Sequence, residues 1–287
     1  TSSSSNPPRS RSPVAATLAL LCAGGLVAVG VFTGYPIATA FTVTGAVVGT
    51  GLALGGDPAW NKYLQIGTLW VLVPVIGGAA AYALGRLLRS SSLSTPVVVS
   101  VLGGLVGAIV ANIEFVLLGP PGESASLAGT VTATVSWPVP VAIGVTTIVL
   151  ASVVAGILFH RASVDPTVAN QEFLLALGGL VAFSAGGTQV GLALGPLLPL
   201  LDPYELPLTV VLVGGGLGLL AGSWTGAPRM IKALSQDYSS LDPKLSIAAL
   251  IPSFAIAQVA VLFGIPVSFN EIIVSAIVGS GLAGGSG

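Results

Sequence analysis

Residues 34–55 (GYPIATAFTVTGAVVGTGLALG) and residues 264–285 (GIPVSFNEIIVSAIVGSGLAGG) decide the fold of this chain. The two segments lie 230 residues apart and align without a gap, with nine identities in twenty-two positions. Both begin with Gly-x-Pro, and both end with Val-Gly-x-Gly-Leu-Ala before a final glycine. A duplicated apolar segment that starts with Pro and is interrupted by Gly is typical of secondary transporters, in which two related halves form one site near the bilayer midplane.

The composition assigns the chain to a class. Hydrophobic residues make up 53% of the 287 residues, charged residues only 7%, and the mean hydropathy is +0.98. Soluble domains carry about 25% charged residues, so we predict an all-α, multi-pass protein of the cell membrane. The net charge of −1 provides no basic surface for nucleic acid, and a single cysteine, Cys22, excludes an internal disulfide framework.

Seven runs without charge, or nearly so, are long enough to cross a bilayer, which takes about 20 apolar residues. They are residues 14–33, 64–85, 97–118, 139–159, 173–200, 206–222 and 245–263. The two duplicated segments come in addition to these runs. Each is expected to be either a re-entrant helical hairpin or one interrupted crossing, and in both cases to face protein or a cavity, because broken backbone is tolerated only there.

The chain is expected to form one membrane transport domain with two repeat halves, 1–162 and 163–287. Extended backwards, the duplication pairs Pro13 with Pro243 and Leu20 with Leu250. The second half also contains a predicted broken helix at 173–200 and a span at 206–222, which have no counterpart in the first half. We therefore expect the native chain to carry such a pair upstream of Thr1.

Three motifs carry a family resemblance. Residues 183–196 (FSAGGTQVGLALGP) resemble the broken-helix signature of the PiT inorganic phosphate transporters, F-x-x-G-x-N-D-V-x-N-A-x-G-P. The duplicated segments are similar to that family's Pro-x-Ser-Thr-Thr-His hairpins, and residues 70–88 (WVLVPVIGGAAAYALGRLL) to its W-V-x-x-P-x-x-G-G-x-x-A-Y helix. The resemblance covers most of the chain. It implies inverted halves with broken helices and re-entrant hairpins, and a phosphate carrier coupled to a cation, with sodium expected.

The polar positions of these motifs have changed. Thr188-Gln189 stands where the family has Asn-Asp, and the two hairpin tips read Ala38-Thr39-Ala40-Phe41 and Ser268-Phe269-Asn270-Glu271. Polar groups and backbone N–H groups at a helix start make an anion site. The resemblance therefore implies substrate binding by five polar residues and ion coupling by a carboxylate and an amide. The substrate-binding residues are Thr39, Thr188, Gln189, Ser268 and Asn270, and the ion-coupling residues are Glu271 and Gln189.

The substitutions leave the substrate open between phosphate and other tetrahedral oxyanions. Phosphate keeps one or two protons near neutral pH and profits from a carboxylate acceptor, whereas sulfate needs only donors. Without the family's Asp, sulfate remains an alternative cargo. The coupling ion is sodium or a proton. Thr188 and Gln189 could instead form hydrogen bonds that hold neighbouring helices together, without binding a ligand. Glu271 is different, because a carboxylate is costly to place in a bilayer and is therefore expected to have a functional role.

Enzyme chemistry is not indicated, because the chain lacks a nucleophile–base motif, a HExxH or CxxC motif and a phosphate-binding Gly-Lys loop. The alternative from another class is a membrane subunit or sensor that keeps the fold without transport. The expected partners are the oxyanion, the coupling cation, the lipid bilayer and a second copy in a homodimer. With seven spans, every Lys and Arg except Lys62 falls on one side, as the positive-inside rule favours, but inverted halves would require an odd number of crossings between equivalent points.

Overall fold

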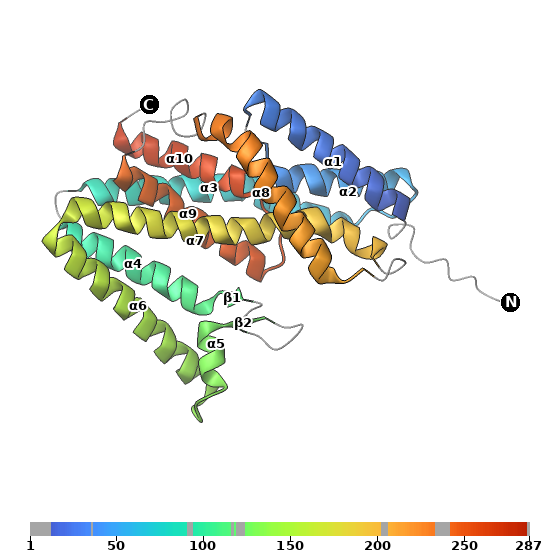
Figure 1. Cartoon of the computed structure of the whole chain (residues 1–287). Helices are drawn as coiled ribbons and strands as arrows, with labels where there is room; N and C mark the ends of the chain where they lie inside the picture. Colours follow the sequence, from blue (N-terminus) through green and yellow to red (C-terminus); the bar gives the residue numbers. More distant parts are fainter. Residues whose placement is uncertain are drawn as a thin grey trace.

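The computed structural model describes residues 13–35, 37–90, 94–115, 118, 124–201, 206–232 and 242–285. Helices dominate it (Figure 1), and a two-residue antiparallel pair, β1 and β2, joins Glu114 to Ser126 and Phe115 to Ala125. The elements in chain order are α1 (Pro13–Thr33), α2 (Thr39–Ala53), α3 (Trp60–Arg89), α4 (Thr95–Asn112), β1 (Glu114–Phe115), β2 (Ala125–Ser126), α5 (Leu127–Thr132), α6 (Val139–Val164), α7 (Pro166–Leu194), the 3-10 helix η3 (Gly195–Leu200), α8 (Leu208–Lys232), α9 (Pro243–Leu262) and α10 (Phe269–Gly284).

Seven helices in the described part of the chain are long and apolar enough to cross a membrane, and each overlaps one of the seven apolar runs. The run 97–118 is helical only as far as Asn112, where α4 ends before β1. The predicted multi-pass, all-α membrane fold is thereby confirmed. Helices α2 and α10 have 15 and 16 residues. At 1.5 Å per residue each measures roughly 23 Å, which is less than the roughly 30 Å hydrocarbon core, so neither spans it alone.

The two duplicated segments share one local structure. Each begins at a glycine with positive φ, Gly34 (78°) or Gly264 (61°), and each has a second such glycine just past its helix, Gly55 or Gly285 (both 82°). Left-handed backbone of this kind favours glycine, which has no Cβ. Each copy is thus an extended stretch followed by one helix, and it packs against the helix that precedes it, α2 against α1 and α10 against α9.

Residues 173–200 were expected to form a broken helix, but the structure has regular α-helix there as far as Leu194. The α-helix α7 runs without interruption from Pro166 to Leu194, and the change to 3-10 geometry comes at Gly195. Pro196 has no N–H to continue the α-helical ladder, which accounts for the position of the change. Thr188 and Gln189 therefore lie on regular helix, about two turns before the backbone departs from it.

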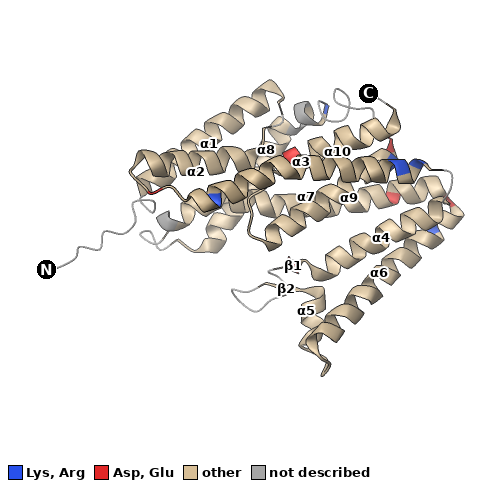
Figure 2. Cartoon of the chain, turned by 180° about the vertical axis from the view of Figure 1, so that it is seen from behind, with Lys and Arg blue, Asp and Glu red and all other residues tan. Residues whose placement is uncertain are grey.

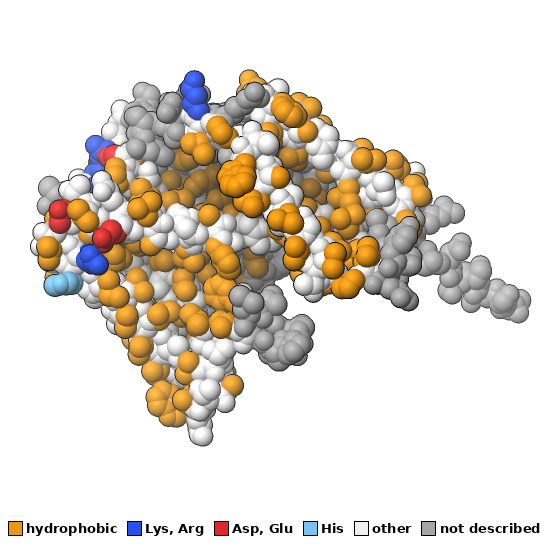
Figure 3. All heavy atoms as spheres, viewed as in Figure 1, with side chains coloured by type: hydrophobic (Ala, Val, Ile, Leu, Met, Phe, Trp, Pro, Cys, Tyr) orange, Lys and Arg blue, Asp and Glu red, His pale blue; other side chains and the backbone are white. Residues whose placement is uncertain are grey.

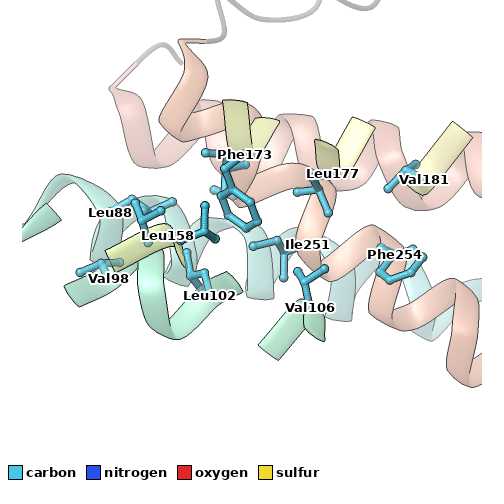
Figure 4. Packing of buried hydrophobic residues seen from close by; sticks show 13 residues of the cluster. Leu88, Val98, Leu102, Val106, Leu158, Phe173, Leu177, Val181, Ile251 and Phe254 are labelled. Carbon is cyan, nitrogen blue, oxygen red and sulfur yellow. The ribbon is translucent and has the colours of Figure 1, made fainter. Parts of the chain in front are cut away.

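A main hydrophobic cluster joins α3, α4, α6, α7 and α9 (Figure 4). Phe254 on α9 and Leu177 on α7 are its largest fully buried side chains, with exposed fractions of 0% and 1%. Elsewhere α3 and α10 approach so closely that a Cβ at Gly279 would lie 2.0 Å from the carbonyl oxygen of Gly78. Glycine contacts of this kind let membrane helices pack backbone to backbone.

Charge and hydrophobicity divide the surface. Most Lys and Arg side chains of the described chain gather at the end of the molecule where α3 ends and α4 begins (Figure 2). Hydrophobic side chains cover much of the remaining face (Figure 3), and none of residues 208–225 of α8 is buried. This broad apolar surface is the one that a bilayer covers.

Candidate functional site

The starts of the two duplicated segments lie against each other. The amide Nδ2 of Asn270, in the first turn of α10, donates to the carbonyl oxygen of Ile37, just before α2, at 2.8 Å. The two residues are 233 positions apart in the chain. The tip of the second copy is therefore held directly on the tip of the first.

Helix α7 contributes the third wall of this site. The hydroxyl Oγ1 of Thr39, the first residue of α2, donates to Oε1 of Gln189 at 3.1 Å. Both side chains are partly buried. Because the carbonyl end of Gln189 accepts this bond, its NH₂ group keeps two donors for another acceptor.

Thr188 points in a different direction. Its hydroxyl donates to the carbonyl oxygen of Ser184 at 3.0 Å, and its side chain lines a cleft of about 650 Å³ between α7, α9 and β1. Gln258 of α9 lines the same cleft and donates through Nε2 to Oγ of Ser184. Successive residues of a helix project about 100° apart, so Thr188 and Gln189 face different neighbours of α7.

The start of α10 carries buried polar atoms that lack a partner. Ser268 is its N-cap and is 0% exposed, yet its hydroxyl makes no hydrogen bond to any described residue. One carboxylate oxygen of Glu271, Oε2, is likewise buried and unpartnered within the described chain. A buried polar atom without a partner costs about 1–3 kcal/mol. The free N–H groups of the first turn lie here too and make this the positive end of the helix dipole.

Trp70 on α3 fixes both tips. Its indole Nε1 donates to the carbonyl oxygen of Pro266 at 2.9 Å, and the ring of Phe41 stacks on it with a centroid distance of 3.9 Å. Phe41 occupies the position in the first copy that Glu271 occupies in the second. The same place in the repeat is thus used for packing in one copy and for a buried carboxylate in the other.

The predicted residues are only partly brought together. Thr39 contacts Gln189, and Asn270 contacts the extended stretch before Thr39, whereas Thr188 is the one predicted residue among those that line the 650 Å³ cleft. The polar residues Ser184 and Gln258 of the cleft were not predicted. Both lie inside apolar spans, where a polar side chain usually forms hydrogen bonds within the protein, and this was the signal that could have identified them.

The carboxylate of Glu114 lies at the rim of the same cleft. Glu114 is an exposed residue of β1, and its Oε2 accepts a hydrogen bond from the hydroxyl of Ser124 at 2.6 Å. The rest of the lining is mostly apolar, with Phe115, Phe183 and Phe254 among its residues. The cleft is therefore an amphipathic opening beside Thr188.

Comparisons with known proteins agree on one family. The sequence profile described as "Phosphate transporter family" matches residues 4–287. A protein of Chlamydia muridarum that is named as a phosphate permease is 26% identical over 305 residues, which cover 94% of this chain and 71% of that protein. The chloroplastic inorganic phosphate transporter 2-1 of Arabidopsis thaliana is 24% identical over 313 residues, covering 93% of this chain and 52% of the plant protein.

The fold has a counterpart among solved structures. A structure described as the sodium-dependent phosphate transporter superposes with a TM-score of 0.73 at 18% sequence identity, over 94% of this chain and 70% of that one. At this identity the likeness establishes the shared fold. This chain thus spans roughly half to seven-tenths of the length of these relatives.

Proposed function

Because this chain belongs to the phosphate transporter family, we propose that it carries inorganic phosphate across the membrane as a secondary transporter, through a site where the tips of the two duplicated segments meet α7. The observation that carries the proposal is the hydrogen bond from Thr39 to Gln189. It joins the first duplicated segment to the signature helix. A packing role alone would not require that both partners be the residues that align with the family's polar motifs.

Substrate binding in this proposal rests on neutral donors. The hydroxyl of Ser268, the amides of Gln189 and Asn270, and the N–H groups at the start of α10 all suit an oxyanion. Thr39 gives its one hydroxyl proton to Gln189 and would act by orienting the donors of that amide towards the substrate. The buried hydroxyl of Ser268, which has no partner in the described chain, supports the proposal because a bound anion would supply the missing acceptor. Thr188 would contact the substrate from the cleft side of α7.

The proposal also includes the coupling of anion transport to a cation. Glu271 places a carboxylate in the first turn of α10, and its buried oxygen has no partner among the described residues. Sodium is a hard cation that prefers oxygen ligands, so this carboxylate and the side-chain oxygen of Gln189 would bind it. The sodium-dependent transporter that shares the fold makes sodium the first ion to test, with the proton as the alternative.

Sulfate is a second candidate cargo, favoured by one specific observation. The position that aligns with the family's Asp is Gln189, whose charge is zero. Sulfate carries no proton near neutral pH and binds through donors alone, whereas phosphate also donates and gains from a carboxylate acceptor. A site that contacts the substrate through neutral donors, with no carboxylate at position 189, is chemically suited to sulfate.

One transport experiment separates these functions. The full-length protein is reconstituted into proteoliposomes, and uptake of labelled phosphate and labelled sulfate is measured under a sodium gradient, a potassium gradient and a pH gradient. We expect phosphate uptake that the sodium gradient accelerates. Preferred uptake of sulfate would show that sulfate is the transported anion. Acceleration by the pH gradient alone would show that the coupling ion is a proton.

The remaining alternative is a membrane subunit or sensor that does not transport. It predicts phosphate binding, measured with labelled phosphate on the detergent-purified protein, without uptake of either anion. Absence of both uptake activities in the reconstituted full-length protein would overturn the carrier proposal.

A further inference from the structure

A crevice lies between α6 and α7, beside the interface of α6 with α4. It has a volume of about 300 Å³, and its wall is apolar apart from one ion pair at its end. The apolar lining comes from α4, α6 and α7 and consists of Val106, Val154, Ile157, Leu158, Phe173, Ala176, Leu177 and Leu180. A pocket of this size is at the lower end of the range that binds small ligands.

The crevice is preformed because α6 is fastened to α4. A Cβ at Gly103 would lie 2.1 Å from the side chain of Leu158, and one at Gly107 would lie 3.1 Å from the carbonyl oxygen of Leu150. The hydroxyl of Ser100 adds a hydrogen bond to the carbonyl oxygen of Ala155 at 2.9 Å. Helix α6 cannot move towards α7 without losing these contacts, so the space beside α7 stays open.

A cation stands at the end of this apolar space. The Nη1 of Arg161, in the last turn of α6, lies 3.4 Å from Oε1 of Glu172 on α7, and the two side chains are 60% and 46% exposed. A guanidinium has five donors in a fixed fork, and this single long contact leaves most of them available. The carboxylate of the nearby Asp165 already accepts two hydrogen bonds through Oδ1, from the backbone N–H groups of Thr167 and Val168.

Position in the membrane completes the argument. Arg161 lies near the end of a membrane-length helix, at the level where lipid headgroups meet water, and the apolar wall extends from it along α7 into the bilayer. We propose that this crevice between α6 and α7 binds an anionic phospholipid, with its phosphate on Arg161 and one acyl chain along Ala176 and Leu180. A cation between membrane helices at the headgroup level binds anionic headgroups in this way, and here the phosphate would share Arg161 with Glu172.

The proposed lipid would reach towards the cleft beside Thr188. Leu180 lines both the crevice and the 650 Å³ cleft. An acyl chain that passes Leu180 would approach Phe183 and Ser184 on the next turn of the same helix. The binding site is argued from the crevice alone and stands whether or not the chain carries phosphate.

The test is native mass spectrometry of the detergent-purified full-length protein titrated with phosphatidylglycerol and with phosphatidylcholine of the same acyl chains. We expect phosphatidylglycerol to bind up to about fivefold more tightly, the preference that one surface Arg gives for an anionic headgroup. Arg161→Gln should remove this preference, whereas Arg161→Lys should keep most of it. Equal binding of the two lipids by the unaltered protein would overturn the proposal.

Two further variants separate lipid binding from structural support. Glu172→Gln breaks the same ion pair as Arg161→Gln but leaves the cation in place, so it should keep or strengthen the preference for phosphatidylglycerol. Equal losses in both variants would show that the pair only fastens α6 to α7. Ala176→Trp, at an exposed position in the wall, should weaken binding of both lipids by filling the crevice, and unchanged binding would place the lipid elsewhere.

Discussion

The side chain of Gln189 marks the main chemical difference between this site and the motif that it resembles. Its oxygen accepts a hydrogen bond from Thr39 at 3.1 Å, which orients the amide so that two N–H donors face away from Thr39. A carboxylate at this position would accept bonds only. The substitution therefore keeps an acceptor towards Thr39 of α2 and adds two donors on the side that faces away from it.

Thr39→Val and Gln189→Ala should each lower phosphate uptake. A net hydrogen bond is worth about 0.5–1.5 kcal/mol, which corresponds to roughly a two- to tenfold change in affinity. Because the two residues share this bond, the double variant should lose less than the sum of the single losses. The measurement is the initial uptake rate in proteoliposomes as a function of phosphate concentration.

Thr68→Val and Gln65→Ala are matched controls for this prediction. Both residues are exposed on α3, and Gln65 makes its hydrogen bond only to Lys62 in the described chain. They should leave uptake unchanged. Strictly additive losses at Thr39 and Gln189 would contradict the view that the two residues act through one contact.

Glu271→Gln should remove the dependence of uptake on sodium. The variant keeps the size and one acceptor oxygen of the side chain, replaces the other oxygen by an NH₂ donor, and removes the charge that would attract a cation. We expect phosphate uptake to become slow, by about tenfold or more, and equal in sodium and potassium, because a hydrogen bond to a charged group is worth about 1.5–3 kcal/mol. The measurement is uptake at several sodium concentrations.

Glu172→Gln is the control for the charge change at Glu271. Glu172 is a surface residue whose ion pair with Arg161 contributes little, since exposed pairs are worth about 0–1 kcal/mol. Phosphate uptake by the Glu172→Gln variant should depend on sodium as it does in the unaltered protein. An unchanged sodium response in Glu271→Gln would instead assign the carboxylate to packing.

At the scale of elements, the two copies of the duplicated segment have the same shape and different surroundings. Gly279 in α10 lies against the backbone of Gly78 in α3, whereas nothing lies within 4 Å of a Cβ built at Gly49, its counterpart in α2. The shared Val-Gly-x-Gly-Leu-Ala sequence thus supports a tight helix contact in the second copy only. The same Val-Gly-x-Gly-Leu-Ala motif thus lies in two different packing environments.

Gly279→Ala should destabilise the protein by about 1–3 kcal/mol, the usual cost of overpacking. The added methyl group would lie 2.0 Å from the carbonyl oxygen of Gly78, which cannot move without shifting α3. The measurement is thermal unfolding in detergent, followed by tryptophan fluorescence. Gly49→Ala is the matched control and should unfold at the temperature of the unaltered protein or slightly above, because alanine favours the helix.

If both variants unfolded at the same temperature, the close contact of α3 with α10 would contribute nothing to the stability of the protein. The comparison holds sequence and helix position constant and changes only the neighbour. It therefore isolates the packing contribution from helix propensity.

At the scale of the whole molecule, charge placement indicates an orientation. Lys62 lies near the start of α3 and Arg89 at its end, and 27 residues of helix between them correspond to roughly 40 Å. Most Lys and Arg residues share the end of Arg89 (Figure 2). Positive residues concentrate on the cytoplasmic side, so the start of α3 should face outwards.

Cysteine labelling checks this orientation. In a Cys22→Ser background, Lys62→Cys should react with a membrane-impermeant maleimide in intact cells. Arg89→Cys should react only after the cells are permeabilised. The reverse pattern would invert the orientation, and labelling of both cysteines from outside would mean that α3 does not cross.

The sequence predicted much of the fold and part of the site. Apolar length alone located all seven spans, because a bilayer requires the same run of apolar residues wherever it is crossed. The meeting of the tips followed from the duplication. The cleft residues Ser184 and Gln258 were missed, because a polar side chain in an apolar span carries no mark of the neighbour to which it bonds.

By itself, the sequence determined the class, the family and the positions of the turns. Hydrophobic length, proline and glycine act locally, and the glycines with positive φ fall at equivalent ends of both copies, Gly34 and Gly264, then Gly55 and Gly285. The tertiary structure decided what each polar residue faces. It turned Gln189 towards Thr39 and Thr188 towards the cleft, and it stacked Phe41 on Trp70 while its counterpart Glu271 kept a buried oxygen without a partner in the described chain. Such directions depend on the packing of helices far apart in the chain, which no local pattern encodes.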